Sequence, residues 1–258
     1  MNKNLEYLIK RYQEFPEVDA ICLGGSRARS ANLNDDASDY DVYIYLNKPL
    51  SKEKRIEVLE KITCYREIDN GFFEPEDDVI MNDNIPLELI YRRIADFEEM
   101  IKKVMIDCVP QAGYTTCFVD NMLNSIVLFE RNNVYTNFRN KYSFQYPTRL
   151  KENIIKLNRD YLSGTMASFD GQIIKAYKRG DVVSINHRTC EFVKCYFDIL
   201  FALNETYHIG EKRLLSFALD NFKVLPKDFE KNLNMLLFKP DDIESLLREI
   251  IDNLDELI

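Results

Sequence analysis

Short apolar runs alternate with amphipathic segments along the first half of the chain. Apolar positions recur at helical spacing in three segments, at residues 5–15, 51–62 and 95–105. Shorter runs with the character of strands lie between and after them, at residues 18–23, 42–46, 87–91 and 125–129. The acidic stretch 67–83 carries Gly71 and Pro75, and it is predicted to be an exposed loop.

The second half of the chain has a different pattern. From about Pro147 onward the strand signal disappears, and helical periodicity continues to the last residue. Over residues 243–257 the apolar positions fall on one stripe and charged residues lie opposite. We therefore predict an α+β protein, in which an N-terminal domain over residues 1–145 has a small mixed β-sheet flanked by helices. An all-helical domain over residues 146–258 follows it.

Composition and charge narrow the function classes. Among 258 residues, 46% are hydrophobic and only 8 are glycine, which indicates an ordinary folded protein. Lys and Arg number 34 against 43 Asp and Glu, and the net charge of −9 argues against a nucleic acid as partner. No apolar stretch is long enough for a membrane span, no secretory signal is visible, and the six cysteines show no CxxC spacing. We expect a cytoplasmic protein with reduced thiols and no membrane partner.

The first candidate for chemistry is the sequence Gly24-Gly25-Ser26. It follows directly on the apolar run 18–23, and a short helix could begin at Ser26. Backbone N–H groups at such a place bind anions well. A glycine turn at the end of a strand explains the same residues without any ligand.

A pair of carboxylates comes next, in the sequence Ser38-Asp39-Tyr40-Asp41. Because side chains alternate along a strand, Asp39 and Asp41 are expected to point to the same face. Two like charges so close favour a divalent cation between them, and oxygen ligands favour Mg²⁺ or Mn²⁺. The alternative is a solvated acidic start of a strand. The sequence lacks the GK[ST] of a Walker-type phosphate loop and the spacing of an EF-hand.

Glu88 is the third candidate. It stands in the middle of the apolar run 87–91, where a carboxylate is costly unless it is paired, bound to metal or catalytic. A glutamate on the solvent face of an edge strand is the alternative interpretation.

These three features together resemble the signature of the polymerase-β-type nucleotidyltransferase superfamily. The sequence LGGSRARS…ASDYDVYIY is most similar to those of bacterial minimal nucleotidyltransferases and of aminoglycoside and lincosamide nucleotidyltransferases. The motifs cover roughly residues 18–92, and the helical half is similar in character only.

The resemblance implies a role for each residue of the motifs. Gly25 and Ser26 would hold a triphosphate, and Asp39 and Asp41 would hold Mg²⁺. Glu88 would act as general base on the acceptor hydroxyl or as a further metal ligand, and both possibilities stay open.

Three more residues are candidates for phosphate binding. By the resemblance, Ser38 would contact phosphate or metal-bound water, and a lysine of the helical domain would reach the phosphates, for which Lys212 is the candidate. Arg27 follows the Gly-Ser turn and could reach phosphate as a cation. The alternatives are a surface arginine at Arg27 and a solvated helix start at Lys212.

The function that the resemblance implies is Mg²⁺-dependent transfer of AMP from ATP to a hydroxyl of a small acceptor, such as an aminoglycoside or lincosamide antibiotic. An acidic cleft would suit a polycationic acceptor. The alternatives are an antitoxin-type nucleotidyltransferase that AMPylates proteins, and a nucleotide-binding module without turnover. Some antibiotic-modifying relatives build their site across a dimer, so a homodimer is also possible.

Overall fold

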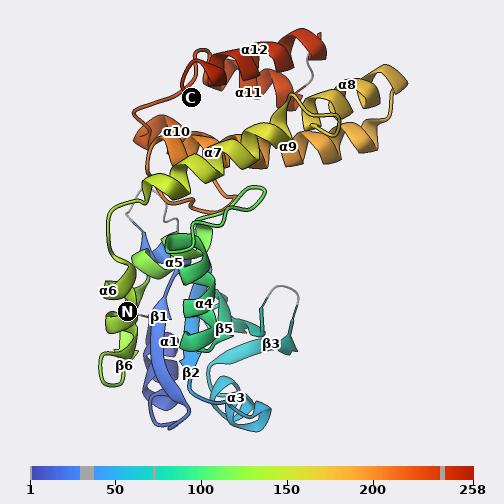
Figure 1. Cartoon of the computed structure of the whole chain (residues 1–258). Coiled ribbons are helices and arrows are strands. Elements are labelled where there is room, and N and C mark those ends of the chain that lie inside the picture. The colour runs from blue at the N-terminus through green and yellow to red at the C-terminus, as the bar shows by residue number, and fades with distance from the viewer. Residues whose placement is uncertain (1, 30–37, 72–73, 239–241) are drawn as a thin grey trace. The chain divides into compact units, whose positions relative to one another are not determined.

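The chain folds into two compact units (Figure 1). The structure, a computed structural model, describes residues 2–29, 38–71, 74–238 and 242–258. The first unit comprises residues 1–102 and 121–144, and the second comprises residues 103–120 and 145–258. The division into domains at residue 145 stays a prediction, and the structure adds that residues 103–120 pack with the helical part of the chain.

A six-stranded mixed sheet forms the centre of the first unit, in the order β3-β4-β5-β2-β1-β6. Its strands are β1 (Val18–Leu23), β2 (Tyr40–Leu46), β3 (Thr63–Asn70), β4 (Glu76–Met81), β5 (Pro86–Arg92) and β6 (Ile126–Glu130). Strands β2 and β5 run parallel, and the other described pairs are antiparallel. The predicted α+β class with a mixed N-terminal sheet is confirmed.

Strands β3 and β4 form an antiparallel pair, so the prediction of an exposed loop over residues 67–83 was wrong. Burial alternates along β4, where Asp77, Val79 and Met81 are buried. Asp77 is fully buried because Arg55 donates to it at 2.6 Å and the Tyr91 hydroxyl donates to it at 2.8 Å. The sequence alone does not distinguish the buried Asp77 from a solvated aspartate, and β4 was therefore not predicted.

Helices cover both faces of the sheet (Figure 1). In chain order they are α1 (Lys3–Tyr12), α2 (Gly25–Ala28), α3 (Lys52–Leu59), α4 (Ile94–Met105), α5 (Cys117–Asn124) and α6 (Val134–Tyr142). Helices α1 and α3 pack on the face that carries Val42 and Ile44. On the other face the ring of Tyr45 packs against Phe97 of α4 and Tyr135 of α6. Because strand side chains alternate, Asp41 lies on this second face with Tyr43 and Tyr45.

Helices make up the second unit from residue 148 onward, as the periodicity predicted. They are α7 (Thr148–Leu162), α8 (Phe169–Arg179), α9 (Val182–Leu203), α10 (Leu214–Asn221), α11 (Phe229–Phe238) and α12 (Ile243–Asp255). The apolar stripe of α12 is buried in the core of this unit, which confirms the amphipathic interpretation of the last helix. Among the described residues, no helix is long and apolar enough to cross a membrane.

Asp198 of α9 anchors the segment 103–120 to this helical unit. Its carboxylate accepts from the backbone N–H of Thr115 at 3.0 Å, from the Thr115 hydroxyl at 2.7 Å and from Asn158 Nδ2 at 3.0 Å. The side chain is only 1% exposed. Burial raises the pKa of Asp198 to about 6, and these hydrogen bonds only partly offset that rise.

The raised pKa of Asp198 predicts a pH-dependent stability. An acid with a pKa of about 6 in the folded state and about 3.9 in the unfolded state binds its proton more tightly when folded. Its contribution to stability is present below pH 4 and is lost as the pH rises through 6. We expect the free energy of unfolding to fall by about 3 kcal/mol over this range through Asp198 alone. Urea unfolding measured from about pH 4 to pH 7 should show this fall in the wild type, and Asp198→Asn should lack it.

Asp220→Asn is the matched control, because Asp220 is an exposed acid of α10 in the same unit. This control should keep the pH dependence of the wild type. An Asp198→Asn protein whose free energy of unfolding still follows the wild-type pH profile would contradict the assignment.

Candidate active site

Three carboxylates converge at one edge of the sheet in the first unit. Asp39 precedes β2, Asp41 is its second residue, and Glu88 is the third residue of β5. One carboxylate oxygen from each of the three lies within 4.8 Å of the others, and all three residues are half-buried. The structure therefore brings together the three acids that the sequence singled out.

The sheet register explains why the three acids meet. Strands β2 and β5 are parallel neighbours, and Asp41 is paired directly with Glu88. Directly paired residues point to the same face, and Asp39 points that way too because it lies two residues before Asp41. Strand β5 lies between β4 and β2, so the alternative of Glu88 on an edge strand was wrong.

The chemistry of these donors fits a hard divalent cation. Carboxylates this close repel one another unless a cation lies among them, and carboxylate oxygens are the ligands that Mg²⁺ and Mn²⁺ prefer in proteins. Among the described residues, this is the one cluster of three or more potential metal ligands. The residues that would hold the metal are therefore Asp39, Asp41 and Glu88.

Gly25 makes the close approach between the glycine turn and Asp41 possible. The Gly24 N–H donates to the Asp41 carbonyl at 2.8 Å, which fixes the turn on β2. Gly25 has φ of +58°, and a Cβ added there would lie 1.6 Å from Asp41 Oδ2. Helix α2 begins at Gly25, and Ser26 is its second residue. The turn and the carboxylates thus form one continuous structure.

The side chains of Tyr43, Asn121 and Arg92 form a cluster that packs against this turn, and the sequence analysis did not predict it. A Cβ at Gly24 would lie 2.2 Å from Cε2 of Tyr43, so the tyrosine ring packs directly on the turn. The Tyr43 hydroxyl accepts from Asn121 Nδ2 at 2.9 Å, and the guanidinium carbon of Arg92 lies 4.1 Å from the ring centre. Arg92 also donates to Asn121 Oδ1 at 2.9 Å. Nothing in the sequence signals this cluster, because Asn121 is distant in the chain from both partners.

Arg27 is directed at the start of β2. Its Nε donates to the carbonyls of Ser38 and Asp39, both at 2.9 Å, and its guanidinium lies 4.1 Å from the centre of the Tyr40 ring. These contacts hold the backbone from which Asp39 projects. The interpretation of Arg27 as a surface arginine was therefore wrong, and its contact with phosphate stays a prediction.

The remaining candidates are placed as follows. Ser38 is half-buried directly before Asp39, and Ser26 lies one residue after Gly25 in α2. Lys212 belongs to the second unit, where it is exposed in the turn before α10. The helix start expected at Lys212 lies two residues further along the chain, since α10 begins at Leu214 with Arg213 as its cap.

Part of this chain matches a known protein family. The family model described as "Nucleotidyltransferase domain" matches residues 5–113, a range that includes the three carboxylates and the glycine turn. No curated protein matches the chain. The solved structures similar to it include a nucleotidyltransferase-like protein from Exiguobacterium sibiricum, at 12% identity and a TM-score of 0.47 over 99% of this chain and 73% of that one.

Two further solved structures are similar at lower scores. An aminoglycoside 6-adenyltransferase from Bacillus subtilis has 9% identity and a TM-score of 0.29, over 100% of this chain and 92% of that chain. A CCA-adding enzyme from Thermotoga maritima, complexed with tRNA, has 9% identity and a TM-score of 0.31, over 98% and 80%. With TM-scores below 0.5, these similarities say nothing about the substrate.

Proposed function

This chain belongs, through its residues 5–113, to the nucleotidyltransferase domain family, and we propose that it transfers AMP from ATP to a hydroxyl group of a second substrate. The observation that carries the proposal is the convergence of Asp39, Asp41 and Glu88 within 4.8 Å beside a glycine turn. When bound there, Mg²⁺ would neutralise charge on the phosphate oxygens of the nucleotide.

The residues around the carboxylates would bind and orient the nucleotide. Gly25 and Ser26 would hold the triphosphate through backbone N–H groups and the serine hydroxyl. Ser38 would contact phosphate or metal-bound water. Arg27 would keep Asp39 in position through the carbonyls it binds. Lys212 remains a candidate phosphate ligand only by the family resemblance.

The transfer itself is a displacement at the α-phosphorus. The acceptor oxygen forms a bond to that phosphorus, the bond to the pyrophosphate oxygen breaks, and the hydroxyl proton passes to a base. Glu88 would take this proton or would hold the metal as a third ligand. Retention of the complete carboxylate set supports turnover over a binding module, because carboxylates this close are costly to hold together unless a cation lies among them.

A row of carboxylates favours a polycationic acceptor, such as an aminoglycoside, over a lincosamide. In the sheet register Asp41 pairs with Glu88, Glu88 with Asp78, and Asp78 with Glu67. Directly paired residues share a face, so four acids from four adjacent strands follow one another on the face that carries the candidate active site. A cationic acceptor would be attracted along this row toward the phosphate.

A panel of acceptors tests the proposed function. The purified full chain is incubated with Mg²⁺, with ATP or another nucleoside triphosphate, and with an aminoglycoside, a lincosamide or a protein mixture. We expect acceptor-dependent release of pyrophosphate with ATP and an aminoglycoside, and a mass increase of the acceptor by one adenylyl group. Labelling of protein alone would favour the AMPylating alternative. Absence of pyrophosphate release across the whole panel would contradict the proposal.

A further inference from the structure

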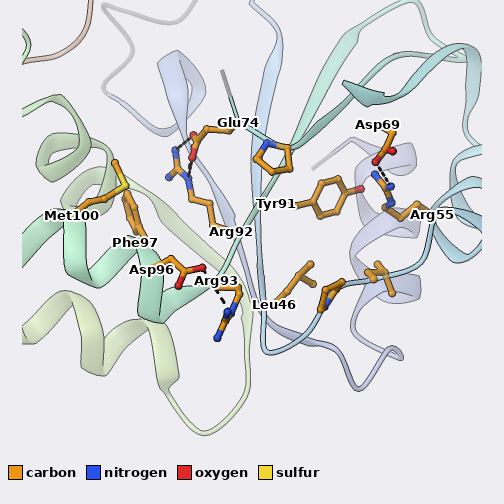
Figure 2. Close-up of a pocket in the computed structure, with 13 residues that line it drawn as sticks. Leu46, Arg55, Asp69, Glu74, Tyr91, Arg92, Arg93, Asp96, Phe97 and Met100 are labelled. Atoms are coloured by element: carbon orange, nitrogen blue, oxygen red, sulfur yellow. Dashed lines mark hydrogen bonds and ion pairs between the residues drawn. The ribbon is translucent and has the colours of Figure 1, made fainter. Parts of the chain in front are cut away.

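A cavity lies in the first unit, at the opposite end of β2 and β5 from the candidate active site (Figure 2). Its volume is about 420 Å³, and Leu46 and Arg92, the last residues of β2 and β5, line it. The carboxylates of Asp41 and Glu88 belong to the beginning of the same two strands. At about 3.3 Å per residue, four or five residues separate the two places by roughly 13–17 Å. The cavity is therefore distinct from the carboxylate site.

Apolar side chains form most of the wall of this cavity. They come from the end of β2, the segment that follows it, the residue before β4 and helix α4: Leu46, Pro49, Leu50, Pro75, Phe97 and Met100. Leu46, Leu50 and Phe97 are almost fully buried, whereas Met100 is 44% exposed and lies at the rim. Cavities of this size with mainly apolar walls are typical of sites for small molecules.

The charged residues of the lining compensate one another. Arg55 donates to Asp69 at 2.8 Å, Arg92 donates to Glu74 at 2.8 Å, and Arg93 lies 3.8 Å from Asp96. Figure 2 shows these pairs around the cavity. Three arginines and three acids leave the described lining without net charge. A charged ligand would lose its hydration without gaining a partner, whereas an uncharged one would lose little.

From the volume, the apolar wall and the balanced charges, we infer that this cavity binds a small, uncharged and mostly apolar molecule. This inference does not rest on the proposed transfer of AMP, because the lining includes none of the three carboxylates. The deep wall formed by Leu46, Leu50 and Tyr91 would enclose the apolar body of the ligand, and the rim formed by Arg93, Asp96 and Met100 would remain in water.

A pair of fluorescent probes that differ by one charge tests this inference. N-phenyl-1-naphthylamine is uncharged, and 1-anilinonaphthalene-8-sulfonate carries the same rings with a sulfonate. Titration of the full chain should show that one molecule of the uncharged probe binds saturably per chain. Its affinity should be about tenfold higher than that of the sulfonate. Met100→Glu should weaken binding of the uncharged probe about tenfold, because it places a charge on the rim.

The matched control is Met166→Glu, which makes the same change at a fully exposed methionine of the second unit. It should leave the affinity for the uncharged probe unchanged. Because Met100 is itself partly exposed, its variant should fold, and thermal unfolding of both variants verifies this. The inference is overturned if the uncharged probe does not bind saturably, if the sulfonate binds more tightly, or if the two variants weaken binding equally.

Discussion

Asp41→Asn is expected to lower nucleotidyl transfer by about three orders of magnitude, equivalent to about 4 kcal/mol in the activation free energy. The substitution keeps the size of the side chain but removes a charge from the cluster in which carboxylate oxygens lie within 4.8 Å of one another. A metal that offsets charge on phosphate would then be bound weakly and out of position. Acceptor-dependent release of pyrophosphate measures the rate.

Titration with Mn²⁺ gives a second measurement that needs no acceptor. The affinity for Mn²⁺ should fall about tenfold or more in Asp41→Asn, because one of three anionic ligands is lost. Asp83→Asn is the matched control, since Asp83 is an exposed acid in the β4–β5 turn of the same unit. It should bind Mn²⁺ as the wild type does. Wild-type transfer by Asp41→Asn would refute the metal assignment.

Gly25→Ala is the second substitution with a large expected effect. Its Cβ would lie 1.6 Å from Asp41 Oδ2, so the carboxylate must move away from the position it shares with Asp39 and Glu88. We expect transfer to fall by about two orders of magnitude, because a small displacement of a catalytic group is costly. The φ of +58° adds about 1–2 kcal/mol of strain, which lowers the free energy of unfolding. Pyrophosphate release and urea unfolding measure the two effects.

Gly180→Ala separates the strain from the displacement of Asp41. Gly180 caps α8 with φ of +67°, and no atom lies within 4 Å of a Cβ built there. This control should therefore lose about the same stability through strain but keep wild-type transfer and Mn²⁺ binding. If both alanine variants lost transfer equally, the close approach of Gly25 to Asp41 would have no special role.

Local patterns in the sequence were sufficient for the fold class and for the candidate acids. Periodicity separated the strands of the first half from the helices of the second, because it depends only on which faces are apolar. The spacing of Asp39 and Asp41 predicted that both carboxylates point to the same side, because side chains alternate along extended chain. Glu88 stood out because a lone acid in an apolar run needs a partner.

Other features depend on contacts between distant segments, and only the tertiary structure decided them. Strand β4 looked like a solvated loop because the partner of the buried Asp77 is Arg55, 22 residues away. In the sequence Arg27 could not be told from a surface arginine, because the carbonyls of Ser38 and Asp39 that it binds are 11 and 12 residues away.

The sequence by itself determined which residues could do chemistry, since residue type and strand alternation are local properties. The register of β2 against β5 decided that Asp41 and Glu88 face one another, and no local pattern specifies which strands are neighbours. The cavity at the other end of these strands is likewise a product of the tertiary structure. Its wall comes from segments between Leu46 and Met100, and only packing in three dimensions brings them together.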